Sequence, residues 1–472
     1  MKEQKTILLP IYNGTRARNF FRFDTYKSLI SDPGVKLVVV APKVKVDFYR
    51  KEFNEPNVIF EGLEVASEPL FGRILAEFAF NLFNTNTIRM KQRLEYFRYG
   101  NYPRYIAMRI LNRTLSPFFP MTRAMIRFFE KFVPVNPEIA ELLEKYKPNM
   151  VLLPDIVFPI DRIFMRAAKK ARLPAGRKKY FVMGLVRSWD NLTSKGVVQI
   201  LPDKMVVLNS IMVGEAQKYM GMPKDGIYIS GSPQYDIYFN KKYPKKSREE
   251  FLSELEIPQG RRLILCAPFF NDYTKSAIKI INTLTDSIQN GGLPKDLHLL
   301  VRFRPNSTEI PAGKLDTSEH LTITKPCQIY FDNMGGLVKQ DYEFTESDVE
   351  LLFNSLYFSD VTINTISTLS IDAAALDKPV INVRFDAEPS CPQKHSVEQM
   401  VGHDHYETIE RSGGVALAHS LDQLLEQINE YLKNPSLHKA GREVMRKEQI
   451  ELMDGKSGER VANFIRQELL NL

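Results

Sequence analysis

The feature that most constrains the fold is a repeated alternation of short apolar runs with amphipathic segments. Residues 6–12 and 36–41 are largely apolar runs, as in strands covered on both faces, and a polar turn and a helical pattern lie between them. The same order recurs through 150–154 and 179–186. Strand, helix and strand in succession build parallel sheets. We therefore expect an α/β fold.

The alternation is interrupted once, which divides the chain into two domains. Turn formers and lysines dominate residues 232–248, and a second series of strand and helix patterns follows them. A chain of 472 residues is also too long for one ordinary core. The sequence predicts two doubly wound Rossmann-like domains facing a cleft. The predicted bounds are 1–231 for the first domain, 232–248 for the linker, 249–455 for the second domain and 456–472 for a helix that returns to the first.

Composition restricts the compartment and the chemistry. The chain is 44% hydrophobic and 25% charged, which is typical of soluble globular proteins. Its three cysteines, Cys266, Cys327 and Cys391, are far apart and match neither a disulfide framework nor a zinc site, so we expect no bound metal. Neither a secretory signal nor a long apolar span is evident. We expect a cytoplasmic protein.

Positive charge is concentrated in residues 69–132, which we interpret as a helical insertion in the first domain. The segment has eleven Lys or Arg against three Glu, an excess equal to the net charge of +8 of the whole chain, and ten Phe. Basic helices with aromatic faces are attracted to anionic membrane surfaces, so peripheral association with the inner face of the plasma membrane is expected. A partly buried subdomain with solvated arginines is the alternative. No recognised nucleic-acid motif accompanies the charge, so no nucleic-acid partner is expected.

Two segments of the second domain predict a site for a nucleotide-linked donor. A strand pattern ends at Asn364, and Thr365, Ser367 and Thr368 supply hydroxyl donors suited to a diphosphate at the start of the next helix. Asp372, one turn into that helix, is expected to accept ribose hydroxyls. An ordinary helix cap is the alternative for these hydroxyls.

The other donor segment contains two arginines. Arg302 and Arg304 follow another strand, before Pro305, where guanidinium groups either neutralise a phosphate or form surface salt bridges.

The first domain carries the candidates for catalysis. In residues 188–196, Asp190 is suited to take a proton from an acceptor hydroxyl and Lys195 to hold an anion. An Asx turn with a tryptophan as a core anchor is the alternative. The turn after the first strand is also considered, because its glycine lets a ligand approach the backbone. The acceptor-side candidates are Gly14, Arg18, Asp155, Asp161, Trp189 and Asn191.

These motifs resemble those of GT-B glycosyltransferases, in the group near bacterial surface-polysaccharide transferases and CDP-glycerol glycerophosphotransferases. The glycerophosphotransferases have a His-Gly-Thr-Pro-x-Lys-like acceptor loop ending in Gly, which residues 189–196 resemble, with Asp190 where a His stands. Their donor-side Arg, His and Pro resemble residues 302–305, again without the histidine. Their Ser-rich turn, helix and Lys-Pro-Ile strand resemble residues 367–381.

The resemblance implies a nucleotide-sugar donor on the second domain and a lipid-linked glycan acceptor on the first, with no metal or other cofactor. Because both histidines are replaced, an Asp-based inverting sugar transfer is expected, with a CDP-glycerol-type glycerophosphotransferase as the alternative. A UDP-N-acetylglucosamine 2-epimerase-like enzyme and a non-catalytic nucleotide- or lipid-binding scaffold are the other readings.

Overall fold

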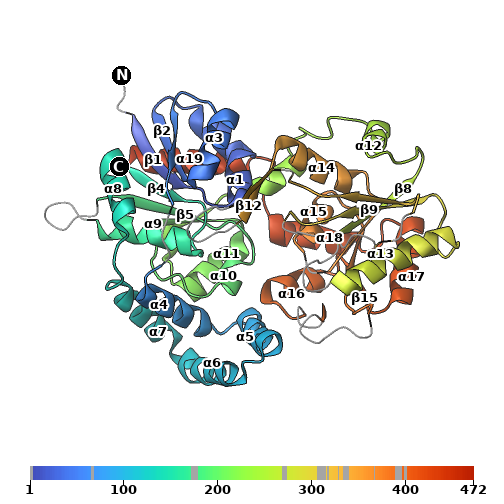
Figure 1. Ribbon diagram of the computed structural model, residues 1–472, viewed down its shortest axis with the longest axis horizontal. Coiled ribbons are helices and arrows are strands. Elements are labelled where there is room, and N and C mark those ends of the chain that lie inside the picture. Colours follow the sequence, from blue (N-terminus) through green and yellow to red (C-terminus); the bar gives the residue numbers. More distant parts are fainter. Residues whose placement is uncertain are drawn as a thin grey trace.

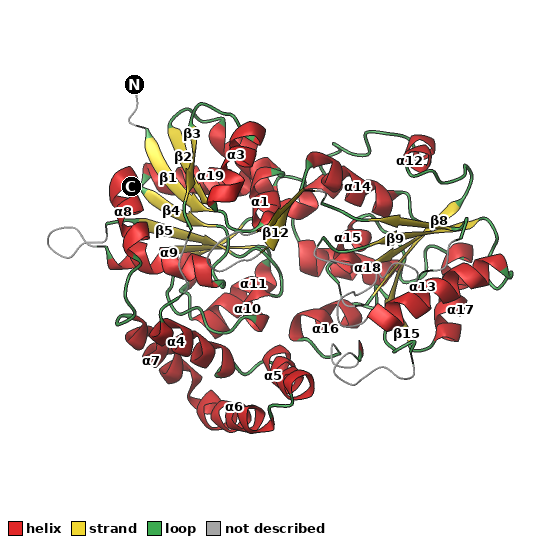
Figure 2. Cartoon of the chain, viewed as in Figure 1, coloured by secondary structure: helices red, strands yellow, loops and turns green. Residues whose placement is uncertain are grey.

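The computed structural model has two parallel sheets side by side, each between layers of helices (Figures 1 and 2). It describes residues 4–64, 68–171, 179–267, 274–305, 315, 318–327, 329–332, 340–365, 367–388, 396–397 and 401–472. Cys266 and Cys327 are buried and free, whereas Cys391 lies outside the described residues. The predicted α/β class with two Rossmann-like sheets is confirmed.

The first sheet has the order β3-β2-β1-β4-β5-β6-β7. Its strands are β1 (Lys5–Pro10), β2 (Val35–Ala41), β3 (Val58–Gly62), β4 (Met150–Leu153), β5 (Phe181–Leu185), β6 (Lys204–Val207) and β7 (Ile227–Ile229). Residues 37–41 of β2 are fully buried because helices cover both faces, which explains the unbroken apolar run. The helices are α1 (Gly14–Phe21), α2 (Asp24–Ile30), α3 (Lys43–Glu52), α8 (Pro137–Tyr146), α9 (Pro159–Lys170), α10 (Asn191–Ser194) and α11 (Ser210–Glu215).

The basic segment forms a helical subdomain on one side of this sheet (Figure 1). Its helices are α4 (Leu70–Asn81), α5 (Asn86–Tyr99), α6 (Tyr102–Leu115) and α7 (Phe119–Glu130). Arg123 and Arg127 donate to backbone carbonyls of residues 218–220 and Arg127 also to that of Val198, so these two cations hold the subdomain onto the first domain.

The second sheet has the order β10-β9-β8-β13-β14-β15. Its strands are β8 (Arg262–Ala267), β9 (Leu297–Arg302), β10 (Leu321–Thr324), β13 (Val361–Asn364), β14 (Val380–Val383) and β15 (Ala416–Ala418). The helices are α12 (Arg248–Glu254), α13 (Thr274–Gln289), α14 (Glu346–Tyr357), α15 (Leu369–Ala375), α16 (Asp404–Arg411), α17 (Leu421–Lys433) and α18 (Lys439–Met445). Capping boxes begin α12 at Ser247 and α14 at Thr345, which fixes where these helices start.

Two of the connections between the halves, within the described residues, come from the final helix and from a hairpin. The final helix, α19 (Ser457–Leu470), packs against α2 of the first domain, and its Phe464 stacks on Tyr228 of β7 with ring centroids 4.0 Å apart. Asp236, in the 3-10 segment η5 (Pro233–Tyr238), accepts hydrogen bonds from the backbone N–H groups of Ser457 (3.0 Å) and Gly458 (2.8 Å). The region between the sheets thereby fixes the start of the returning helix.

The other connection is a hairpin of the second half, β11 (Ile329–Asp332) and β12 (Gln340–Glu343), which inserts toward the first domain (Figure 1). Buried Lys45 donates to the carboxylates of Asp341 and Glu343, and Tyr49 donates to Glu343 at 2.6 Å. Gly14 donates its backbone N–H to Asp341 at 2.8 Å. A Cβ atom at Gly14 would lie 1.7 Å from the carbonyl oxygen of Tyr342. In this structure β12, which packs directly against Gly14, explains why a glycine stands there, and approach of a ligand to its backbone stays a prediction.

Candidate active site

A cleft of about 980 Å³ lies at the carboxyl ends of the second-sheet strands and reaches the first domain. Both sides contribute to it, because Arg18 of α1 and Gln234 of η5 join lining residues from β9 and α15. Five of the donor-side candidates line it: Arg302, Arg304, Ser367, Thr368 and Asp372. The acceptor-side candidate Arg18 also lies here, beside the donor candidates, with its guanidinium carbon 4.8 Å from the centre of the Phe344 ring.

Arg302 is a buried cation of this cleft, and one nitrogen of its guanidinium group lacks a hydrogen bond within the described part of the chain. Its side chain is 8% exposed, and its buried Nη1 has no hydrogen-bond partner among the residues that the structure describes. Burial lowers the pKa of Arg302 to about 10, against the opposing charge of Asp348, so the group stays cationic at neutral pH. A buried guanidinium nitrogen without a partner is costly unless an anion or water satisfies it.

Asp372 is held rather than free. Burial raises the pKa of its carboxyl to about 6, although Tyr238, Arg18 and Arg302 oppose that rise. The Tyr238 hydroxyl donates to Oδ1 at 2.8 Å. Binding to a ribose through the remaining oxygen stays a prediction.

The hydroxyls before α15 divide between two places. Ser367 Oγ accepts from the backbone N–H of Leu369 at 3.2 Å, so it helps to cap the helix while Ser367 and Thr368 also line the cleft. Thr365 lies behind the turn, where it lines a separate cavity of about 360 Å³ and its carbonyl accepts from Tyr406 at 3.3 Å. The structure therefore does not bring Thr365 to the cleft with the other two.

Asp190 lies in a cluster of ionisable groups where the two halves meet. Burial would raise its pKa, but Lys195, His405, Ser188 and Ser194 outweigh it and lower the pKa to about 2. Ser194 Oγ donates to Asp190 at 2.9 Å, and Lys195 Nζ lies 3.9 Å away. Asp190 is therefore a carboxylate at any physiological pH, and its strength as a base is low.

The neighbours of Asp190 come from three helices. Burial lowers the pKa of His405 (α16) to about 4 and that of Lys91 (α5) to about 8, and it raises that of Glu215 (α11) to about 8. Next to His405, the Asp404 carboxylate accepts from the backbone N–H (2.7 Å) and hydroxyl (2.9 Å) of Thr87, which fixes the start of α5. Strongly shifted groups gathered from separate elements are typical of functional sites.

The remaining acceptor-side candidates are engaged inside the protein. Trp189 is buried and contacts the His405 ring edge-on, with centroids 4.8 Å apart, so it anchors the first domain to the second. Asp155 accepts from Arg187 and Asn191 at 3.1 Å each. A fully buried Asp161 pairs with Arg16 at 3.0 Å.

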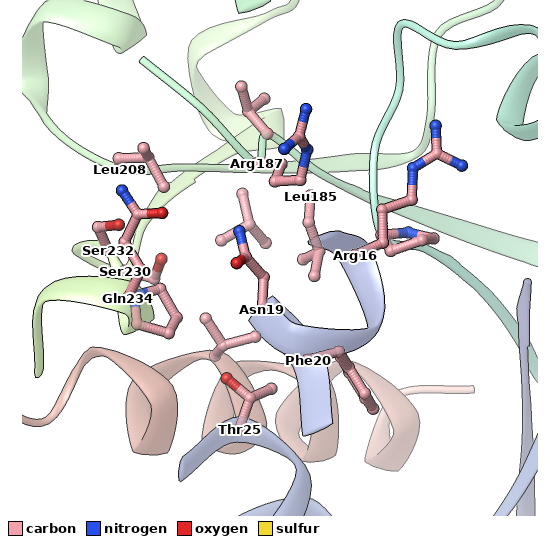
Figure 3. Close-up of a pocket in the computed structure, with 15 residues that line it drawn as sticks. Arg16, Asn19, Phe20, Thr25, Leu185, Arg187, Leu208, Ser230, Ser232 and Gln234 are labelled. Carbon is pink, nitrogen blue, oxygen red and sulfur yellow. The ribbon is translucent and has the colours of Figure 1, made fainter. Parts of the chain in front are cut away.

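A second cavity, of about 510 Å³, lies at the carboxyl ends of β5, β6 and β7 in the first domain. Figure 3 shows Asn19 of α1 pointing into it, with Arg187 on the opposite side and Ser232 and Gln234 along one wall. Gln234 lines both this cavity and the larger cleft, so the two spaces are adjacent.

Sequence reasoning missed several residues of this region. Arg16, Asn19 and Gln234 lie in turns and short helices that carry no motif, and the carboxylates of β12 are far in sequence from the lysine they bind. His405 was visible only as one of two histidines flanking an aspartate. No group of three or more His, Cys, Asp or Glu able to hold a metal ion occurs within the described part of the chain.

Comparison with known proteins places this geometry in context. Residues 198–467 match the family model described as CDP-glycerol:poly(glycerophosphate) glycerophosphotransferase. Among curated proteins, the teichoic acid ribitol-phosphate polymerase TarK of Staphylococcus aureus is 22% identical over 213 residues, 44% of this chain. The match covers 35% of TarK, so the chain spans about a third of the length of that relative.

Solved structures share the fold. The MnaA–UDP structure from S. aureus has a TM-score of 0.56 at 12% identity, covering 99% of this chain and 98% of that one. UDP-GlcNAc 2-epimerase of Neisseria meningitidis bound to UDP-GlcNAc has a TM-score of 0.54 at 11% identity, covering 99% and 100%. At these identities the likeness shows the two-domain GT-B architecture alone.

Proposed function

The chain belongs to the CDP-glycerol:poly(glycerophosphate) glycerophosphotransferase family, and from this premise we propose that it transfers a polyol phosphate from a cytidine-diphosphate-linked donor to a polyol-phosphate acceptor chain in cell-wall polymer synthesis. The observation that carries the proposal is that the matched residues, 198–467, contain the whole second-domain wall of the cleft, including Arg302, whose Nη1 has no hydrogen-bond partner among the described residues.

This proposal corrects the expectation of a nucleotide-sugar donor. The replaced histidines favoured sugar transfer, but the family match favours the glycerophosphotransferase alternative over it. The Asp-for-His replacement then changes how the acceptor is activated rather than what is transferred.

In the proposed reaction, an acceptor hydroxyl attacks the distal phosphorus of the donor, the new O–P bond forms and the bond to CMP breaks. Arg302 and Arg304 stabilise the charge that develops on the diphosphate, with Ser367 and Thr368 as hydroxyl donors. Asp190 accepts the hydroxyl's hydrogen bond and then its proton, which passes to solvent, and Lys195 holds the attacked phosphate. These cations suffice without a metal ion or other cofactor in this proposal.

A donor panel tests the proposal. CDP-glycerol, CDP-ribitol and UDP-N-acetylglucosamine are each mixed with a short poly(glycerol phosphate) acceptor, and nucleotide release and acceptor extension are measured. We expect extension with a cytidine-linked polyol only. Extension with the UDP-sugar alone would restore sugar transfer, and binding of nucleotide without turnover of any donor would favour the scaffold reading.

We further propose that the acceptor is lipid-linked and that the basic insertion rests on the inner face of the plasma membrane. Its apolar side chains are unusually exposed for a surface helix pair: Leu70, Phe71, Ile74 and Phe78 on α4, and Met121, Met125, Phe128, Phe129 and Phe132 on or just after α7. No helix within the described ranges is long and apolar enough to span a bilayer.

Flotation with liposomes tests the membrane proposal. The double variant Phe128→Ser/Phe132→Ser should abolish binding to vesicles containing phosphatidylglycerol, and Arg89→Glu/Arg93→Glu should weaken it by about fivefold per charge. Tyr357→Ser, an exposed aromatic of the second domain, is the matched control. Equal flotation of all three variants would contradict a role for this face.

A further inference from the structure

The first-domain cavity has the wall chemistry of an anion site. Two arginines, Arg16 and Arg187, line it, and none of its lining residues is acidic. The space of about 510 Å³ between its lining residues includes the open mouth of the cavity. It lies where ligands of open parallel sheets bind, beyond the carboxyl ends of the strands.

Arg187 is held in a way that leaves part of its guanidinium available. Its Nε donates to Asp155 at 3.1 Å, and no hydrogen bond among the described residues engages its two terminal nitrogens. The Asp155 carboxylate also accepts hydrogen bonds from the Asn191 amide and, at 2.8 Å, from the backbone N–H of Ile156, which hold it in place. The carboxylate therefore orients Arg187 without using its planar fork, the part of the side chain suited to a phosphate.

Arg16 lies on the same ring but is already paired. The guanidinium carbons of Arg16 and Arg187 lie 4.6 Å and 5.6 Å from the centre of the Phe158 ring. The buried carboxylate of Asp161 lies 3.0 Å from Arg16. Among the described residues, Arg187 is therefore the cation of this cavity with terminal nitrogens left for an anion.

The other walls suit a polyol. Asn19 Oδ1 accepts a hydrogen bond from Arg18 at 3.0 Å, so the NH2 group of the Asn19 amide points away from Arg18. The buried Ser232 hydroxyl has no hydrogen bond among the described residues. Gln234 adds an amide at the boundary with the donor cleft. Leu185 and Leu208 offer apolar surface to the C–H groups of a carbon chain (Figure 3).

We propose that this cavity is a subsite for a phosphorylated polyol, the end unit of the acceptor chain, with Arg187 at its phosphate and Asn19, Ser232 and Gln234 at its hydroxyls. The inference rests on the proposed function, since it supplies the acceptor-side site for that reaction. The shared Gln234 places the acceptor unit next to the donor.

Binding of glycerol 3-phosphate and ribitol 5-phosphate to the full chain, measured by calorimetry, tests the subsite. We expect saturable binding that glycerol does not reproduce and that CDP-glycerol does not displace. Arg187→Gln, whose amide keeps a donor toward Asp155, should weaken binding at least about tenfold. Ser232→Leu fills the cavity without changing its charge and should weaken binding to the same extent. If Arg187→Gln does not fold, binding by Ser232→Leu tests the subsite on its own. Arg50→Gln, on an exposed side chain of α3, is the charge-matched control.

The outcomes separate the subsite from the proposed function. Displacement by CDP-glycerol, no saturable binding, or unchanged binding in both cavity variants would overturn the subsite even if the donor is turned over. Polyol-phosphate binding that both variants weaken, in a protein that turns over no cytidine donor, would support the subsite and contradict the proposed function. In the active protein, Arg187→Gln and Ser232→Leu should each raise the KM for poly(glycerol phosphate) at least about tenfold and leave the KM for the donor unchanged. An unchanged KM for poly(glycerol phosphate) would mean that a free polyol phosphate binds in the cavity as an effector, and it would overturn the acceptor assignment.

Discussion

The donor cleft and the acceptor-side loops both contain charged residues after strand ends, but they use their charges differently. In the cleft, Arg302 is buried with a guanidinium nitrogen that no described residue satisfies. On the acceptor side, Asp155 is surrounded by donors from Arg187, Asn191 and the backbone. A charge that the fold leaves unsatisfied indicates a ligand, whereas one that the fold satisfies positions its neighbours.

The largest expected effect concerns the contact between β12 of the second half and α3 of the first domain, which holds the two halves together. Lys45→Met leaves the carboxylates of Asp341 and Glu343 buried without their cation, and should lower the free energy of unfolding by about 3–5 kcal/mol in urea denaturation. Arg50→Met, which breaks an exposed pair with Asp47, should cause no measurable change. Equal stability of the two variants would mean that β12 does not hold the halves together.

Within the donor cleft, Arg302→Gln should lower kcat/KM for CDP-glycerol about 100- to 1000-fold, because the developing diphosphate charge loses its buried cation. Arg262→Gln is the control, since Arg262 begins β8, at the amino end of a strand whose carboxyl end faces the cleft, and pairs with Asp296. Comparable losses in both variants would assign Arg302 to folding instead of donor binding.

Asp190→Asn should lower kcat about 100-fold with donor affinity unchanged. Because the pKa of Asp190 is about 2, its carboxylate is ionised throughout, so a step in activity between about pH 5 and 9 would report on Asp372, Lys91 or Glu215 and not on Asp190. Asp47→Asn, at an exposed site, is the control. Near-normal turnover in Asp190→Asn would remove it as the base and turn attention to His405.

The smallest effect concerns Asp161, whose pKa burial raises to about 7 despite the nearby Arg16. The folded state binds this proton more tightly than the unfolded chain, so its contribution to stability is present below about pH 4 and is lost as the pH rises toward 7. Asp161→Asn should flatten that decline by about 1–2 kcal/mol between pH 5 and 7.5 in chemical denaturation. A variant as pH-dependent as the natural chain would contradict the raised pKa.

The donor side was predictable because local order determines it. A strand, a polar turn and a helix are consecutive in sequence, so Arg302, Ser367 and Thr368 could be assigned to a strand end before any fold was known, and the structure places them in one cleft. Thr365 is three residues from Thr368 but faces behind the turn, a difference that depends on backbone direction and not on pattern.

The acceptor side was not predictable in the same way, because its residues are decided by long-range pairing. Gly14 is explained by β12, more than 300 residues away, and Trp189 by a helix of the other half. Likewise, nothing in the sequence near Asp190 indicates His405 or Glu215, since the three meet only when both sheets are assembled.

The hydrogen bonds between Asp404 and Thr87 also bear on motion. They fasten the first turn of α5, a helix of the basic insertion, to the half of the molecule that lines the donor cleft. The cleft cannot widen at this edge without breaking them or dragging the insertion along. In the proposed reaction, release of the spent nucleotide would then be mechanically linked to the insertion, so a surface that steadies those helices would also set the pace of release.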